Sequence, residues 1–345
     1  MLIAAVALLP VVAFLIALVL ADSFKLVPAR QLAWSLAAGA AAAAAALALH
    51  HWLFAVTALS TAHFSRYVAP LTEETLKALV LLYPLRRNRI GFAVDAAIVG
   101  FAIGTGFALA ENVEYLRTLP NRNAWLWIAR GFGTAVLHGT TAAVIAIAAK
   151  TLADRSRHGL AWILPGWGLA VVLHSAFNHA LVSPLLTAAI LLIGLPLVVL
   201  AVFTRSEQAT QDWVGDGLDL DVALLELLQS EHFDATRLGR YLDQLRTRFA
   251  GPVVADMFCL LQLDLELGIR AKVTLMARQA GVAMGADEGL RARLAEREYL
   301  ERAIGPTGLL ALRPLQPAGG RDAWHRYLLE QDAGASRWRR WKRAR

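Results

Sequence analysis

The sequence predicts an all-α protein: a polytopic transmembrane helical bundle of about seven spans, followed by a small soluble helical domain. Of the 345 residues, 57% are hydrophobic and only 18% are charged, which is more apolar than an ordinary soluble domain. Most of the apolar residues precede Arg205, in runs of about 18 residues or more that are typical of membrane-spanning helices. After Arg205, apolar residues recur at three- and four-residue spacing, as in soluble amphipathic helices.

Seven apolar runs are expected to cross the membrane. They cover residues 2–20, 32–49, 70–85, 91–110, 126–149, 160–182 and 185–203. The first run is expected to be a retained helix, because a secretory signal would begin with Lys or Arg and this segment has neither. Loops rich in Lys and Arg alternate with loops that have few, which predicts a multi-pass protein of a bacterial-type plasma membrane with its N-terminus outside and its C-terminus in the cytoplasm.

The composition changes along the chain predict three regions. Residues 1–204 form the transmembrane domain, residues 205–304 a cytoplasmic helical domain, and residues 305–345 an irregular connector with a basic tail. Within the second region, the acidic, glycine-containing residues 212–221 are expected to be a linker. The tail at 337–345 interleaves six Lys and Arg residues with two Trp, so it is either a clamp on an anionic lipid surface or a solvated tail. No nucleic-acid partner is expected, since a net charge of +7 is ordinary for a membrane protein.

Ionisable and amide side chains interrupt four of the apolar runs. Glu73, Glu74 and Lys77 lie in the third run, Glu111 directly follows the fourth on the same helix, and the later runs contain His138, His174 and Asn178. An ionisable residue in the centre of a membrane helix costs about 2.5 to 3.5 kcal/mol, so such residues indicate a functional site. With a rise of about 1.5 Å per residue, Glu74, His138 and His174 lie ~18 to ~22 Å from the cytoplasmic ends of their helices. Glu111 lies ~30 Å from its own cytoplasmic end, so all four belong to the outer half of the membrane.

Carboxylates and imidazoles at one depth favour hydrolysis of an amide. A partly desolvated carboxylate can take a proton from water, and a histidine or amide can donate to the oxyanion that forms when this water attacks a carbonyl. A serine mechanism has less support, because Ser175 lacks the Gly-x-Ser-x-Gly context of a nucleophile elbow.

The same residues resemble the motifs of a known family, the PrsW intramembrane proteases. Glu73, Glu74 and Lys77 are similar to its Glu-Glu-x-x-Lys element, and Phe107 with Glu111 to its Phe-x-x-x-Glu element. His138 resembles the later single histidine of the family, and His174 with Asn178 its His-x-x-x-Asn element. The CAAX prenyl endoproteases are related, but they have His at the position of Glu111, so the resemblance favours the PrsW branch.

This resemblance implies a role for each residue. Glu73 would be the base that activates water, with Glu74 and Lys77 ordering it, although the choice between the two glutamates stays open. Glu111 and His138 would complete the water or metal pocket, and His174 with Asn178 would stabilise the oxyanion. The substrate would be a membrane-anchored protein, typically an anti-sigma factor cut on its extracytoplasmic side.

Three alternatives remain open from the sequence. A metal-free mechanism is favoured, but a zinc-dependent one is possible, in which Glu74, Glu111, His138 and His174 would supply the ligands. The same buried residues would also suit an ion- or proton-coupled transporter, although no internal repeat supports one. A membrane scaffold without activity would carry the same motifs.

Overall fold

The computed structural model describes residues 2–22, 24–119, 123–155, 159–179, 183–282, 288–315 and 320–332. Every regular element in these ranges is a helix, which confirms the predicted fold class. The chain divides after Glu207 into an N-terminal unit, residues 1–207, and a C-terminal unit, residues 208–345. Each unit is considered by itself.

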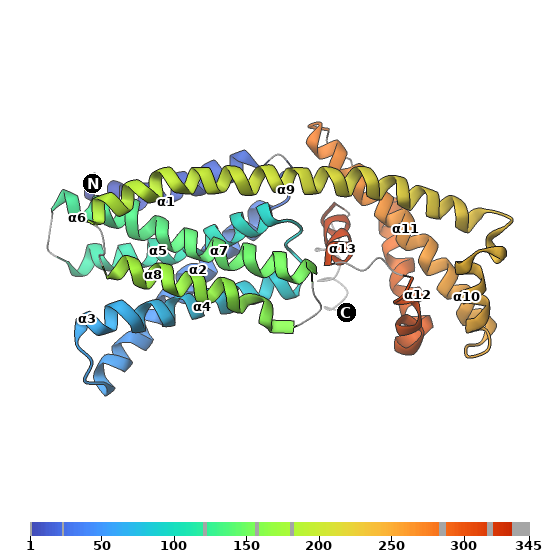
Figure 1. The fold of residues 1–345 in the computed structure, drawn as a ribbon, viewed down its shortest axis with the longest axis horizontal. Helices are drawn as coiled ribbons and strands as arrows, with labels where there is room; N and C mark the ends of the chain where they lie inside the picture. The colour runs from blue at the N-terminus through green and yellow to red at the C-terminus, as the bar shows by residue number, and fades with distance from the viewer. Residues whose placement is uncertain are drawn as a thin grey trace. The chain divides into compact units, whose positions relative to one another are not determined.

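The N-terminal unit is a bundle of helices (Figure 1). Its elements are α1 (Leu2–Ala21), α2 (Ala29–Val56), α3 (Thr61–His63), η1 (Phe64–Val68), α4 (Ala69–Arg86), α5 (Ala93–Thr118), α6 (Ala124–Ile128), η2 (Ala129–Thr134), α7 (Ala135–Arg155), η3 (Gly159–Trp162), α8 (Ile163–Asn178) and the first part of α9 (Pro184–Gln229). The segments η1 and η2 are single π-helical turns continuous with the helices that follow them.

Four helical stretches among the described residues are long and apolar enough to cross a membrane. They are α1, α2, α5 and the continuous stretch Trp125–Asp154, and α8 is a shorter apolar helix. The other two predicted spans fall in α4, which contains the acidic pair, and in α9. The structure therefore supports a multi-pass membrane protein, while the predicted number of about seven spans is not confirmed.

Helix α5 lies at the centre of this bundle, where it packs against α1, α2 and α7 (Figure 1). Most of its residues are buried. A Cβ atom at Gly104 would overlap the carbonyl oxygen of His138 on α7, and one at Gly106 would overlap that of Leu36 on α2. Small residues of this kind let membrane helices approach to backbone contact. The two glycines thereby let α5, which contains Glu111, lie directly against α7 and α2.

The C-terminal unit is a second group of helices. It contains the end of α9, η4 (Phe233–Ala235), α10 (Arg237–Leu245), α11 (Gly251–Gln279), α12 (Glu288–Leu312) and α13 (Gly320–Asp332). The predicted linker at 212–221 is wrong, because α9 runs through it without a break. Lys272 of α11 stabilises α9 at this point. Its Nζ donates to the carbonyl oxygen of Gly217 at 2.7 Å and to Asp221 Oδ2 at 2.6 Å.

The part of the predicted irregular connector that runs from Gly305 to Leu312 is also helical. Helix α12 continues to Leu312, with a kink at Gly305, whose φ of 71° lies in the left-handed region that suits glycine. Pro306 then opens the second segment, where a missing N–H costs nothing. Gly305 and Pro306 therefore lie at a kink between two helical segments and do not end the helix. The predicted basic tail at 337–345 lies outside the described residues.

Candidate active site

Helix α4 presents its acidic pair and its lysine to the interior of the bundle. Glu73 is 7% exposed, and Glu74 and Lys77 are fully buried. Adjacent residues diverge by about 100° around a helix, so the two glutamates face different neighbours. Lys77 lies one turn after Glu74 and forms an ion pair with it. The pair keeps two charges together in a place where either one alone would be costly.

One oxygen of Glu74 is the meeting point of three side chains from three helices. Oε1 accepts a hydrogen bond from Lys77 Nζ at 2.6 Å and one from Thr141 Oγ1 at 3.2 Å. It also lies 2.7 Å from Nδ1 of His174 on α8. Because an ionised carboxylate only accepts, His174 carries its Nδ1 proton toward Glu74. Glu74 therefore fixes the orientation of His174 and leaves Nε2 facing the other way.

His138 on α7 is held from both sides. Its Nδ1 lies 3.2 Å from Lys77 Nζ, and its Nε2 lies 3.0 Å from Glu111 Oε2. An ammonium group has no acceptor, so Nδ1 accepts from Lys77 and the Nε2–H group donates to Glu111. The two contacts define both the tautomer and the plane of this ring.

Glu73 faces the space between the two imidazoles. Its Oε2 atom is buried and has no hydrogen-bond partner in the part of the chain that the structure describes. This oxygen lies 4.0 Å from His138 Nδ1 and 3.9 Å from His174 Nε2. The two rings are nearly perpendicular, with centroids 5.0 Å apart. Glu73 Oε2, His138 Nδ1 and His174 Nε2, from three different helices, thus lie close together around one small space, which we call the pocket.

Arg130 closes this pocket on the side of Glu111. Its Nη2 lies 3.4 Å from Glu111 Oε1, and its Nε donates to Asn112 Oδ1 at 3.1 Å. The guanidinium also covers the ring of Tyr115 at 3.6 Å from the centroid. Asn112 in turn donates to the carbonyl oxygen of Ala7 in α1 at 2.8 Å. The carboxylate of Glu111 is thereby fixed between a histidine and an arginine.

The comparison with known families now decides the classification. The family described as PrsW family intramembrane metalloprotease matches residues 27–204, which include every residue of this pocket. The chain belongs to the PrsW family. It is therefore an intramembrane peptidase and a multi-pass membrane protein. Searches of curated proteins and of solved structures found no match to this chain. The PrsW match ends before the C-terminal unit begins.

Five of the polar residues that resemble the PrsW motifs lie in direct contact with at least one other of them, and a sixth faces two of them; the ring of Phe107 packs against His138, with centroids 4.9 Å apart. The contacting residues are Glu74, Lys77, Glu111, His138 and His174, and the sixth is Glu73. We call these six the polar cluster. Asn178 is not part of it, because its half-buried side chain donates instead to the carbonyl oxygen of Ser65 in η1 at 2.8 Å. In this structure Asn178 connects α8 to η1.

The structure also changes the set of possible metal ligands for this PrsW protein. The group that could hold an ion consists of Glu73, His138 and His174, whose donor atoms lie within 4.8 Å of one another. Glu74 and Glu111, which the sequence suggested, instead bond to the outer nitrogens of the two histidines. Outer carboxylates of this kind often orient the histidine ligands of a metal.

Two residues of the pocket were missed by the sequence argument. Thr141 lies one turn after His138 on α7 and donates to Glu74, but threonine is common in membrane helices and gave no signal. Arg130 lies within the apolar run at residues 126–149. A single arginine within such a run is itself costly, so this signal was available.

Proposed function

We propose that this protein is an endopeptidase that hydrolyses a peptide bond of a membrane-anchored protein, using water activated by Glu73. The observation that supports this best is the position of Glu73 Oε2, which is buried without a hydrogen-bond partner among the described residues and lies 3.9 Å from His174 Nε2. This separation is too long for a direct hydrogen bond and suits two groups that share one water molecule.

In this proposal Glu73 is the general base. A water molecule that donates to Glu73 loses its proton to this carboxylate as its oxygen attacks the carbonyl carbon of the substrate. Among the described residues, Oε2 of Glu74 is buried without a hydrogen-bond partner, as Oε2 of Glu73 is. Glu74 is less suited to the role, because its Oε1 accepts from Lys77 and Thr141 and lies against His174, so that its charge is held by these groups. The geometry thus supports Glu73, and not Glu74, as the base.

His174 is proposed to stabilise the oxyanion. When this ring is protonated, Nδ1 stays on Glu74 and the Nε2–H group points into the pocket, where it can donate to the negative oxygen. The proton held by Glu73 then passes to the leaving amine. Asn178, which the family resemblance paired with His174, is proposed to support α8 through Ser65 instead.

A divalent metal fits this pocket only in part. Glu73, His138 and His174 are suitable ligand types, and a metal bound by three of them with an open position would act as a Lewis acid on water. However, the Nδ1 lone pair of His138 already accepts from Lys77 Nζ at 3.2 Å. A metal would have to displace this ammonium from its buried contacts with Glu74 and Thr141. We therefore propose the metal-free mechanism.

The substrate is proposed to be a single-span protein such as an anti-sigma factor, cut near the outer side of the membrane. Support comes from the family membership and from the loop charges, which predict an N-terminus outside and a polar cluster in the outer half of the membrane. The short exposed segment from Thr61 to Val68, which contains α3 and η1, contacts α8 and α4 and would lie beside the entering chain.

The test is a cleavage assay in proteoliposomes with a panel of single-span anti-sigma factors. Wild type is compared with Glu73→Gln, Glu74→Gln and His174→Ala, and with Glu114→Gln as a control on α5 outside the cluster. We expect cleavage by wild type and Glu114→Gln, and loss in the other three. Full cleavage by all variants would refute the proposed roles, and ion flux without hydrolysis would favour a transporter. Loss of activity on chelation, restored by added zinc, would refute the metal-free mechanism.

A further inference from the structure

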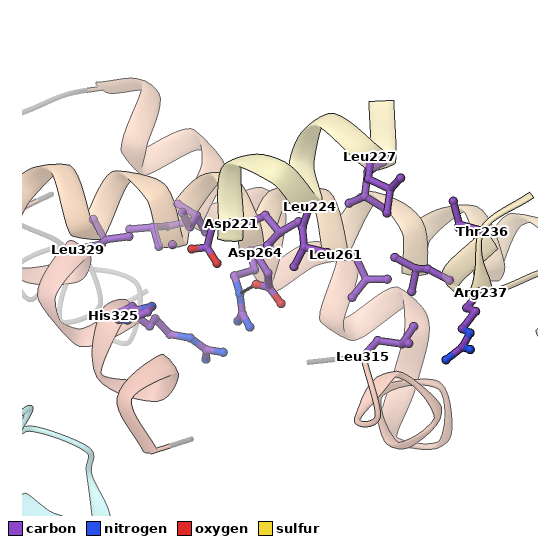
Figure 2. A pocket seen from close by; sticks show the side chains of 18 residues that line it. Asp221, Leu224, Leu227, Thr236, Arg237, Leu261, Asp264, Leu315, His325 and Leu329 are labelled. Atoms are coloured by element: carbon purple, nitrogen blue, oxygen red, sulfur yellow. Dashed lines mark hydrogen bonds and ion pairs between the residues drawn. The ribbon is translucent and has the colours of Figure 1, made fainter. Parts of the chain in front are cut away.

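The C-terminal unit contains a cavity that the proteolytic site does not use. Its volume is about 590 Å³, within the range of about 300 to 1,000 Å³ that is usual for small-molecule sites. The walls come from α9, α10, α11, α12 and α13, all within residues 208–345. Figure 2 shows Leu224 and Leu261 in the middle of the cavity, with Arg237 toward one end and His325 toward the other.

Aliphatic side chains dominate this cavity. Ten of its 18 lining residues are leucines, and the only ring among the others is that of His325. Flat aromatic ligands such as nucleobases are commonly held by stacking on aromatic or guanidinium planes, and the lining contains no Phe, Tyr or Trp, while two of its three arginines are held in ion pairs. A surface of branched aliphatic side chains instead matches a flexible hydrocarbon chain, whose burial contributes about 0.8 kcal/mol per methylene.

The acidic groups of the wall already have cationic partners. Asp221 is paired with Lys272 at 2.6 Å, and Asp264 is paired with Arg297. Arg297 also contacts Glu301, which binds Arg326 at 2.9 Å. Together with Arg237, this network has four cations and three carboxylates, so one positive charge is in excess.

The excess charge belongs to Arg237. This residue begins α10 and lines the cavity, and among the described residues its side chain has no ion pair or hydrogen bond. In Figure 2 its guanidinium lies at the end of the cavity beside Leu315. A guanidinium in this position can bind a carboxylate or phosphate through two parallel hydrogen bonds.

We propose that this cavity binds a single-chain lipid with an anionic head group, with its hydrocarbon chain between the leucines and its head group on Arg237. The dimensions, the aliphatic wall and a lining cation that has no partner among the described residues together favour this ligand. A neutral lipid would gain nothing from the exposed Arg237, and a short polar anion would leave the leucines unfilled.

The experiment uses the full chain in nanodiscs of zwitterionic lipid, with a hexadecanoic acid that carries a photoreactive diazirine. After irradiation, the labelled peptides are identified by mass spectrometry, which separates binding in the cavity from partition into the bilayer. We expect labels on the peptides of α9 and α11 that contain Leu224 and Leu261. Unlabelled hexadecanoate and lysophosphatidate serve as competitors, and the stronger of the two identifies a carboxylate or a phosphate head group.

Two pairs of variants test the two halves of the proposal. Arg237→Ala is compared with Arg240→Ala, an exposed position on the same helix that does not line the cavity. Loss of a charge-assisted contact should weaken labelling by the acid about tenfold or more and leave labelling by the methyl ester unchanged. Leu224→Trp, which fills the cavity, should abolish both, whereas Leu220→Trp, at a 60% exposed position one turn earlier, should abolish neither.

Labels confined to the helices of residues 2–207 would overturn the proposal, as would equal labelling of Leu224→Trp and wild type. Equal labelling by the acid and the ester, insensitive to Arg237→Ala, would overturn the anionic head group. None of these readouts depends on peptide cleavage, so they stand apart from the test of the proteolytic site.

Discussion

His174 Nδ1 lies 2.7 Å from Glu74 Oε1, and this contact gives the two adjacent glutamates of α4 different surroundings. Glu74 is bound through Oε1 to the lysine and the histidine, whereas Glu73 has no such ion pair with Lys77 and its Oε2 faces the space between the two rings. Two identical neighbouring side chains thereby differ: one anchors the histidine, and the other is available to a water molecule.

Replacing Glu73 by Gln is expected to lower kcat by about 10²- to 10⁴-fold, the usual contribution of a general base. The change keeps the shape of the side chain and removes only its ability to accept the water proton. Cleavage rates in proteoliposomes measure the effect. Because the fold should persist, thermal unfolding of Glu73→Gln should match wild type; a variant that keeps wild-type kcat would rule out Glu73 as the base.

Replacing Lys77 by Met is expected to destabilise the N-terminal unit by about 3 to 5 kcal/mol, because Glu74 would remain buried without its cationic partner. The double variant Glu74→Gln with Lys77→Met should lose less than the sum of the two single changes. Unfolding in mixed micelles with increasing SDS provides the free energies. Additive single effects would contradict a coupled pair.

Replacing Gly104 by Ala is expected to separate α5 from α7 and to reduce both stability and cleavage, since the new Cβ would meet the carbonyl oxygen of His138. Overpacking of this kind typically costs about 1 to 3 kcal/mol. The matched control is Gly168→Ala on α8, where a Cβ has open space. Both variants are compared in the cleavage assay and by thermal unfolding, and equal behaviour would contradict the close backbone approach.

His325 is expected to make the C-terminal unit sensitive to acid. Burial, helped by the nearby positive charge of Lys272, lowers the pKa of His325 to about 3, whereas a free histidine titrates near pH 6.5. Between these values the unfolded chain binds the proton and the folded chain does not. Stability is therefore fully present above about pH 6.5 and falls as the pH decreases, by up to about 1.4 kcal/mol per pH unit.

Hydrogen exchange of the α13 peptides in the full chain, measured from pH 7 to pH 5 and corrected for the intrinsic exchange rate, tests this pH dependence. His325→Gln should flatten the profile, and the exposed control His232→Gln should leave it steep. A profile that His325→Gln does not change would assign the acid sensitivity to other groups.

Much of the polar cluster could be predicted from the sequence, because an ionisable residue in an apolar helix is costly enough to stand out. Glu111, His138 and His174 were identified in this way, together with the acidic pair. Asn178 was included by motif, but the amide reaches the carbonyl oxygen of Ser65 and not the cluster. Sequence spacing gives the helix face of a side chain, not the partner that it finds.

The prediction of a linker at 212–221 was wrong for a different reason. Its glycines and aspartates indicate an irregular segment when they are considered locally, but Lys272, distant in the sequence, binds Gly217 and Asp221 and holds the helix together. Tertiary contacts of this kind override local propensity. The leucine-lined cavity escaped prediction similarly, since five helices contribute to it.

Helix α1 lies outside the PrsW match, yet its Ala7 carbonyl accepts from Asn112, the neighbour of Glu111 and partner of Arg130. Gly131 also sits against the backbone of Val6. A version of the protein trimmed to residues 27–204 would retain the whole polar cluster and lose these contacts with α1. We therefore expect the minimal functional unit to begin earlier than the family match does.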